Sequence, residues 1–255
     1  MSTLEIVTVP CRADNYAYLL RDGSGATAVI DAPEAEPITA ALAQRGWGLD
    51  WIWLTHHHPD HVEGVAELAA RHGARVAGCA ADAARLPKLD LGLREGETVM
   101  LGDSRAVVID VSGHTLNHIA FHFPDAKAVF CGDSLFTLGC GRVFEGTHAM
   151  MWGSLSKLAR LDPATTVWHG HEYTLSNLRF ARAVEPGNAA LAEQGAAYEQ
   201  ARAEGRPTVP TTIGRELAAN PFLRAKEAAL QAALGMEGAD AAAVFAEVRR
   251  RKDSF

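Results

Sequence analysis

The segment THHHPDH, residues 55–61, places four histidines and one aspartate within seven consecutive positions. It follows the apolar run LDWIWL, which predicts a β-strand, and precedes VEGVAELAARHG, which predicts an amphipathic helix. Side chains alternate between the faces of an extended backbone, so His56 and His58 are expected on one side and His57 on the other. The segment therefore predicts a cluster of imidazoles at the carboxyl end of a strand, where α/β sheets carry their functional sites.

A carboxylate and a further imidazole complete this segment, because Asp60 and His61 follow Pro59 at the junction between loop and helix. Imidazole and carboxylate are ligand types that zinc, iron and manganese accept in proteins. A solvated loop that is rich in histidine would show the same local pattern. The segment by itself leaves both a metal site and a polar loop open.

Three later segments carry the same ligand types near the ends of predicted strands. His114 shortly follows AVVIDV, Asp133 ends AVFCGD, and His171 ends TVWHGH. A single histidine in such a place is usually structural. Several independent strand ends that all deliver metal ligands favour a metal centre instead.

The composition is that of an ordinary globular protein, with 255 residues, 48% hydrophobic residues and a formal net charge of −7. The negative charge argues against nucleic acid or an anionic membrane surface as a partner. No apolar run reaches the roughly 18–20 residues of a membrane span, and the N-terminus lacks the pattern of a signal peptide. The four cysteines are scattered without a C-x-x-C pair, which favours reduced thiols and a cytoplasmic protein.

The chain changes character near residue 173. Before it, short runs such as ATAVID and AVVIDV alternate with helical patterns, and several predicted strands follow one another without a helix between them. This arrangement favours mixed sheets over a purely parallel one. After it, alanine-rich segments of helical period are separated by turns with proline and glycine. We expect an α/β domain at 1–173 and a small all-helical domain at 174–255.

The segment THHHPDH matches the T-H-x-H-x-D-H motif of the metallo-β-lactamase superfamily, and the later ligand types follow in that family's order. The chain therefore resembles this superfamily throughout its α/β part. The resemblance implies an αββα sandwich of mixed sheets and a centre for two divalent metal ions, zinc before iron or manganese. It implies that one ion is bound by His56, His58 and His114, the other by Asp60, His61 and His171, with Asp133 bridging both. His57 would not be a ligand, and Asp60 would also position a bridging hydroxide.

Five further segments narrow the resemblance: GDSLFTLGCGRVFEGT, GHEYTLSNLRFA, EPGN, NPFLR and RRRKD. With the helical tail they resemble the glyoxalase II family, the hydroxyacylglutathione hydrolases, from end to end. The family implies an enzyme that hydrolyses the thioester S-D-lactoylglutathione, and related 2-hydroxyacyl-glutathiones, to D-lactate and glutathione. This reaction is the second step of methylglyoxal detoxification. The presence of both Asp133 and His61 also points to a two-metal hydrolase rather than a true lactamase.

The same resemblance implies that the helical domain helps to bind the substrate. The implied glutathione contacts are Arg142, Phe144, Tyr173, Arg249 and Lys252. Guanidinium groups bind carboxylates through paired hydrogen bonds, which suits an anionic tripeptide. Phe144 stands where many family members have tyrosine, which removes one hydroxyl from the expected contact. Without the resemblance, the terminal basic run would be read as a solvated helix end.

Other activities on this fold stay open. A broader thioesterase would use the same centre. A persulfide dioxygenase would use a single iron, although the helical tail and the GCGR segment argue against it. A glutathione- or metal-binding module without turnover would keep the ligands and lack the reaction. We expect a monomer, because no uncompensated apolar stripe is evident in the sequence.

Overall fold

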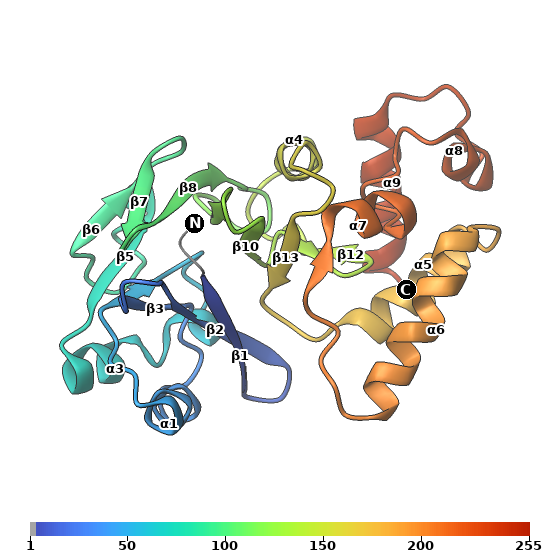
Figure 1. The fold of residues 1–255 in the computed structure, drawn as a ribbon. Coiled ribbons are helices and arrows are strands. Elements are labelled where there is room, and N and C mark those ends of the chain that lie inside the picture. The colour runs from blue at the N-terminus through green and yellow to red at the C-terminus, as the bar shows by residue number, and fades with distance from the viewer. Residues whose placement is uncertain (1–3) are drawn as a thin grey trace. The chain divides into compact units, whose positions relative to one another are not determined.

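The computed structural model describes residues 4–255, which form two compact units. The N-terminal unit comprises residues 4–110 and 116–132, and the C-terminal unit comprises Val111–Thr115 and Asp133–Phe255. Figure 1 colours the first unit from blue to green and most of the second from yellow-green to red. Each helix within residues 4–255 is too short or too polar to span a bilayer.

The first sheet of the N-terminal unit keeps its strands in sequence order. They are β1 (Glu5–Cys11), β2 (Asn15–Arg21), β3 (Thr27–Ile30), β4 (Trp51–Trp53), β5 (Arg75–Cys79) and β6 (Leu91–Leu93). β1, β2 and β3 pair antiparallel, whereas β3, β4, β5 and β6 pair parallel. The crossovers hold α1 (Ala35–Arg45), α2 (Pro59–Val62), α3 (Val65–His72) and a 3-10 turn, η1 (Ala80–Asp82). Parallel pairing requires such long connections, and the predicted mixed sheet is confirmed.

The second sheet of this unit is an antiparallel meander of β7 (Thr98–Leu101), β8 (Ser104–Asp110), β9 (Ile119–Phe123) and β10 (Ala128–Gly132). It packs on the first sheet through aromatic rings. The ring centroid of Trp53 lies 5.1 Å from that of Phe121 and 5.9 Å from that of Phe123. Ile52 joins an apolar cluster with Ile38 of α1 on the other face of the first sheet. Adjacent strand residues face opposite sides, so β4 buries both faces, and the predicted sandwich of mixed sheets with helices is confirmed.

Replacing Trp53 with alanine should lower the free energy of unfolding by about 3–5 kcal/mol, the usual loss for a large aromatic side chain in a core. Trp53 is fully buried between the two sheets, so the change leaves a cavity there. Chemical denaturation followed by circular dichroism measures the loss. The control is Trp51→Ala in the same strand, because Trp51 is only partly buried and lies 3.9 Å from the guanidinium carbon of Arg75. Equal losses in both variants would contradict the assigned core.

Most of the C-terminal unit follows β10. A buried hairpin of β11 (Leu135–Phe136) and β12 (Gly139–Cys140) precedes α4 (His148–Leu158) and β13 (Thr166–His169), which pairs antiparallel with β14 (Thr211–Thr212). The helical region consists of α5 (Thr174–Val184), α6 (Ala189–Ala203), α7 (Ile213–Ala219), α8 (Ala228–Leu234) and α9 (Ala241–Asp253). The predicted C-terminal helical region is confirmed. Its limit at residue 173 as a separate domain stays a prediction.

Local signals in the sequence delimit these helices. Asn188, Thr212 and Asp240 each stand at an N-cap and accept a hydrogen bond from a backbone N–H of the first turn. Gly235 ends α8 in the left-handed conformation, with φ of 69°. The helices pack on one another through an apolar cluster that includes Leu178, Leu191, Tyr198 and Ala219.

Candidate metal centre

The end of β4 and the start of α2 carry the first group of predicted ligands, all within the N-terminal unit. His56 Nε2 lies 3.1 Å from His58 Nδ1, and the ring centroids of His56 and His61 are 4.2 Å apart. His61 Nε2 lies 3.9 Å from Asp60 Oδ2. Pro59 starts α2, which suits a residue without an N–H, and so places Asp60 and His61 on the first turn. The structure brings these four side chains together as the sequence predicts.

Neighbouring polar groups hold both ends of this segment. Asn15 Nδ2 donates to Asp60 at its backbone oxygen, over 3.0 Å, and at Oδ2, over 3.1 Å. His57 Nδ1 lies 3.0 Å from Oδ2 of the buried Asp82. A carboxylate of the protein thus occupies one ring nitrogen of His57. The expectation that His57 is not a metal ligand stays a prediction.

Asp31, directly after β3, is a functional candidate that the sequence analysis did not single out. Its carboxylate accepts hydrogen bonds from the backbone N–H and the hydroxyl of Thr55, each over 2.8 Å. Its Oδ2 also lies 2.8 Å from His61 Nδ1, so that nitrogen carries the proton and Nε2 keeps its lone pair for a metal. Ligand atoms of Asp31, His56 and His61 all lie within 4.8 Å of one another. The sequence does contain a signal for this residue. Asp31 is an acidic residue at the carboxyl end of the predicted strand ATAVID, which contains β3, and β3 pairs parallel with β4.

The second group of predicted ligands lies in the C-terminal unit. Asp133 Oδ2 lies 3.5 Å from His114 Nε2 and 3.2 Å from His171 Nε2. The three side chains are buried. His114 Nδ1 lies 2.7 Å from the backbone oxygen of Arg142, so this ring also carries its proton on Nδ1 and presents Nε2 to Asp133. The structure therefore converges two imidazole nitrogens on one carboxylate oxygen.

These donor sets fit a divalent metal ion of the zinc, iron or manganese type. Histidines that bind metals almost always donate the other ring N–H to a carboxylate or a backbone carbonyl. His61 does so to Asp31, and His114 does so to the Arg142 carbonyl. Buried carboxylates beside neutral imidazoles are the usual remaining ligands of such sites. Each unit thus holds side chains whose placement and hydrogen bonding suit metal binding.

The predicted substrate contacts all lie in the C-terminal unit. Arg142 Nε is 3.4 Å and Arg249 Nη2 is 2.9 Å from the same carboxylate oxygen, Oδ1 of Asp253. The ring of Phe144 lies 5.3 Å from that of His114, which places it beside a predicted ligand. Its side chain is 60% exposed, so it can contact a bound molecule. The side chains of Arg142, Phe144 and Arg249 therefore lie beside His114 and Asp253.

Tyr173 lies beside His171, another predicted ligand of this unit. Its ring stacks on His171, with centroids 4.7 Å apart and planes 3° apart. The residue is 38% exposed. Tyr173 can thus hold the imidazole of His171 in its orientation and still reach a molecule bound beside it.

Lys252 lies within a cluster of cations. Its Nζ is 3.3 Å from Ser176 Oγ and 5.4 Å from the ring centroid of Phe180. Burial lowers the pKa of Lys252, and the positive charges of Arg249, Arg179 and Arg142 lower it further. The positive charge is local, since the whole chain is acidic. Arg179, an exposed residue of α5 that the sequence analysis missed, belongs to this cluster, which would attract an anionic group.

Arg249 makes close contacts with its own chain. Its Nη1 donates to the backbone oxygen of Cys140 over 3.0 Å, and its guanidinium carbon lies 5.0 Å from the ring centroid of Phe222. Only 4% of Arg249 is exposed. The expectation that it binds a substrate carboxylate stays a prediction.

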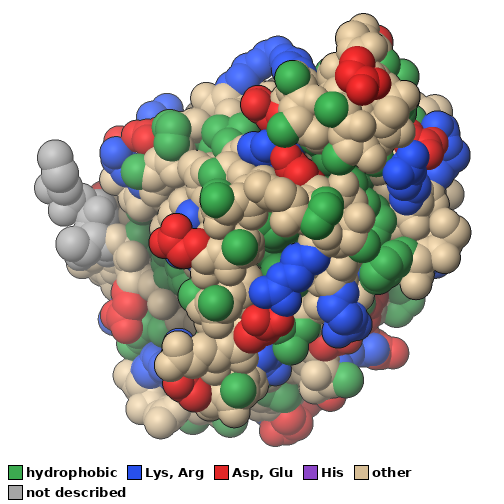
Figure 2. All heavy atoms as spheres, turned by 90° about the vertical axis from the view of Figure 1, so that its right-hand side faces the viewer, with side chains coloured by type: hydrophobic (Ala, Val, Ile, Leu, Met, Phe, Trp, Pro, Cys, Tyr) green, Lys and Arg blue, Asp and Glu red, His purple; other side chains and the backbone are tan. Residues whose placement is uncertain are grey.

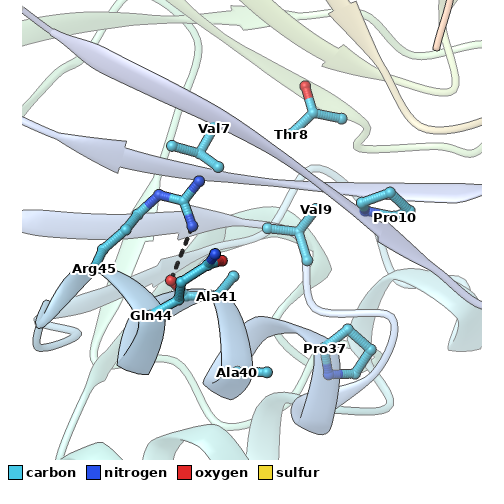
Figure 3. A pocket seen from close by; sticks show the side chains of 9 residues that line it. All are labelled: Val7, Thr8, Val9, Pro10, Pro37, Ala40, Ala41, Gln44 and Arg45. Atoms are coloured by element: carbon cyan, nitrogen blue, oxygen red, sulfur yellow. Dashed lines mark hydrogen bonds between the residues drawn. The ribbon is translucent and has the colours of Figure 1, made fainter. Parts of the chain in front are cut away.

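A pocket of about 310 Å³ lies elsewhere, between β1 and α1, and is drawn in Figure 3. Its lining side chains are Val7, Thr8, Val9, Pro10, Pro37, Ala40, Ala41, Gln44 and Arg45. Arg45 donates to the backbone oxygen of Ala41 in the same helix, as the dashed line shows. None of these lining residues is a histidine, cysteine or acid, so the pocket is not a second site for a divalent cation.

Family comparison covers both parts of the chain. Residues 13–171 match the metallo-beta-lactamase superfamily, and residues 172–255 match the hydroxyacylglutathione hydrolase C-terminus. A hydroxyacylglutathione hydrolase of Ruegeria pomeroyi is 60% identical over 253 residues, which are 99% of each chain.

Solved structures with the same fold are more distant. ETHE1 from Myxococcus xanthus has a TM-score of 0.67 at 22% identity, over 97% of this chain and 90% of that one. A protein solved in a di-iron-bound form, TTHA1623, has a TM-score of 0.61 at 28% identity, over 84% of this chain and 98% of that one. The fold is shared by all of these proteins.

Proposed function

The chain belongs to the hydroxyacylglutathione hydrolases of the metallo-beta-lactamase superfamily, and on this basis we propose that it hydrolyses hydroxyacylglutathione thioesters. The preferred substrate is S-D-lactoylglutathione, and the products are D-lactate and glutathione, as in the second step of methylglyoxal detoxification. The observation that carries the proposal is the identity of 60% along 99% of a relative with that name. The oriented histidines and the neighbouring cation cluster support it chemically.

The proposed metal centre uses both groups of ligands. As the family resemblance implies, His56, His58 and His114 would hold one divalent ion, Asp60, His61 and His171 would hold the other, and Asp133 would be a ligand of both. Two such ions, when bound, lower the pKa of water from 15.7 to roughly 7 and polarise a carbonyl oxygen. The donor set favours zinc, with iron and manganese as the alternatives that elemental analysis distinguishes.

The protein's own groups account for the rest of the reaction. Asp60, held by Asn15, accepts a hydrogen bond from the attacking water and orients it toward the thioester carbonyl. The leaving group is a thiol whose pKa is about 8.5, so it departs as a thiolate without a strong general acid. No nucleophilic side chain is required. Asp31 and the Arg142 carbonyl accept from Nδ1 of His61 and His114, which leaves Nε2 of each ring available to a metal ion.

The cation cluster recognises glutathione. A glutathione thioester carries two carboxylates, and Arg142, Arg249 and Lys252 supply positive charge around Asp253 and the start of α5. Tyr173 donates its hydroxyl to the peptide part. Phe144 contacts the same part through its ring and, lacking a hydroxyl, donates no hydrogen bond there. Arg249 and Lys252 lie within residues 174–255, which supports a role for this helical region in substrate binding.

Arg142→Ala should raise KM for S-D-lactoylglutathione about tenfold or more and lower kcat much less, because a charged hydrogen bond contributes about 1.5–3 kcal/mol. Its contact is remote from the reacting carbonyl, so its loss weakens binding rather than the chemical step. Steady-state kinetics separates the two constants. Arg142→Lys keeps the charge and should restore most of KM, and the exposed Arg160→Ala is the control. A fall in kcat with unchanged KM would contradict the assignment of Arg142.

Location and oligomeric state are further parts of the proposal. The four cysteines are free and buried, and burial raises the pKa of Cys11 to about 12 and of Cys140 to about 11. Such thiols stay protonated and reduced, as in the cytoplasm. The face drawn in Figure 2 intersperses acidic and basic side chains with scattered apolar ones, which supports a monomer. Light scattering should give a molar mass of about 27.3 kDa.

The decisive experiment measures hydrolysis of a panel of acyl-glutathiones beside a simple thioester without glutathione, with the metal content of the same preparation. We expect kcat/KM to be highest for S-D-lactoylglutathione and two metal ions per chain. Equal rates on the simple thioester would indicate a broader thioesterase. Oxygen uptake with glutathione persulfide would indicate a dioxygenase, and bound metal without any turnover would indicate a binding module.

A further inference from the structure

The hairpin β11–β12 joins the proposed bridging ligand Asp133 to the proposed substrate contact Arg142. Its strands are buried and pair only as Leu135 with Cys140 and Phe136 with Gly139. Leu138 at its turn has φ of 57°, in the left-handed region. A short buried hairpin leaves backbone groups that must find partners outside its own ladder.

Side chains at α7 provide the first of these partners. Asn220, the residue after α7, donates from Nδ2 to the Phe136 oxygen over 3.2 Å and to the Gly139 oxygen over 2.9 Å. Glu216 accepts from the Leu138 N–H at Oε2 over 2.7 Å. Asn220 and Glu216 are also bonded to each other, with Nδ2 and Oε2 2.9 Å apart. Both are fully buried.

Two other helices complete the set. Asn177 of α5 donates from Nδ2 to the Thr137 oxygen over 3.1 Å. Arg249 of α9 donates to the Cys140 oxygen. Every residue from Phe136 to Cys140 therefore has a backbone group bound by a side chain of the helical region. The hairpin depends on that region for its conformation.

The clamping side chains approach the hairpin backbone closely, and the burial of Glu216 among them is unfavourable by itself. A Cβ atom on Gly139 would lie 2.4 Å from Asn177 Nδ2, so the amide approaches a backbone that admits no side chain. Burial raises the pKa of Glu216 to about 7, although hydrogen bonds from Thr211, Leu138 and Asn220 lower it. Burying a carboxyl group costs free energy unless hydrogen-bond donors compensate for it. The buried position of Glu216 is therefore explained by the donors that it binds.

We propose that Asn220, together with Glu216 and Asn177, is a positioning clamp that fixes the hairpin and thereby the placement of Asp133 and Arg142. The proposal rests on the proposed function, because it assigns the helical region a role at the metal centre in addition to substrate binding. The Gly141 N–H donates to the backbone oxygen of Ser134 over 3.1 Å, and a Cβ on Gly141 would lie 2.0 Å from the backbone oxygen of Asp133, so the end of the hairpin lies directly against the backbone of Asp133 and Ser134. A shift of about 1 Å at a ligand is enough to cost about a hundredfold in rate.

The test compares Asn220→Ala with Gln231→Ala. Gln231 is a buried amide of the same region that donates from Nε2 to the oxygens of Ala225 and Ala239 and accepts from the Gly238 N–H. Asn220 donates to two backbone oxygens and accepts from the Phe222 N–H. Gln231→Ala thus loses three side-chain hydrogen bonds, and Asn220→Ala loses three of the same kind together with the one to Glu216, but only Asn220 touches the hairpin.

Both variants are first loaded with zinc. We then measure the release of zinc to a chelator, the melting temperature, kcat and KM. We expect Asn220→Ala to weaken zinc retention about tenfold to a hundredfold and to raise KM, as loss of a group behind a metal ligand does. Gln231→Ala should lose comparable stability and keep wild-type zinc retention and KM. If Asn220→Ala does not fold, Asn177→Ala removes a single bond and should change zinc retention in the same direction.

Equal zinc retention and KM in the two variants, at equal loss of stability, would overturn the clamp. If the wild-type protein hydrolyses no thioester, the proposed function fails. The comparison of zinc retention still decides the clamp in that case, because it needs no substrate.

Discussion

Replacing His61 with alanine is expected to reduce the bound metal from two ions to one and to lower kcat by at least about a hundredfold, since even groups behind the ligands are worth about 10–100-fold. His61 is fully buried, and Asp31 holds its Nδ1 so that Nε2 is available as a ligand. Alanine cannot replace this ligand. The remaining metal cannot by itself supply the paired site proposed for the reaction. Elemental analysis and steady-state kinetics on one preparation measure both effects.

The matched control is His57→Ala in the same segment. His57 pairs with Asp82 and is not a predicted ligand, so this variant should retain two metal ions. Full activity of His61→Ala would contradict the two-metal proposal. Loss of an ion from His57→Ala would contradict the ligand assignment.

The second large effect is expected for Asp31→Asn. An asparagine keeps the size of the side chain but turns one acceptor oxygen into an N–H donor, which would face either Thr55 or His61 Nδ1. If it faces His61, the imidazole carries its proton on Nε2, where a metal would bind. We expect metal affinity and kcat to fall about 10–100-fold. Chelator competition and kinetics measure the two quantities.

Asp82→Asn provides the comparison for this variant. Asp82 is an equally buried carboxylate that pairs with a histidine of the same segment, His57, which is not a predicted ligand. The Asp82→Asn variant should therefore retain both metal ions and most of kcat. A similar loss of metal from Asp82→Asn would show that Asp31 acts through general stability and not through the orientation of His61.

The sequence predicted those features that are encoded locally. Alternating apolar runs identified the mixed sheets, and alanine-rich periodic segments identified the helical C-terminal region. The residues 55–61, with their strand before and helix after, place His56, His58, Asp60 and His61 together, because the spacing within one strand end and one helical turn is determined by backbone geometry. The convergence of His114 and His171 on Asp133 also followed from the position of each at a strand end.

Contacts between distant segments that no strand end or motif signals were not predicted. Asp31 precedes the histidine segment by a whole helix and reaches His61 only because β3 and β4 pair parallel. Arg179 looks like any exposed helical arginine until Lys252 packs on its helix. Asn220 and Glu216 read as an ordinary helix end, and their contacts with residues 136–139 join positions about eighty residues apart. Residue type and period carry no information on such pairings.

The sequence by itself determined the fold class, the family and the ligand types, because these depend on periodicity, spacing and motifs along one stretch of backbone. The tertiary structure decided which carboxylate orients His61 and which helices hold the hairpin between Asp133 and Arg142. The physical reason is that buried polar groups must find partners wherever packing brings them, and packing joins residues without regard to their separation in the chain.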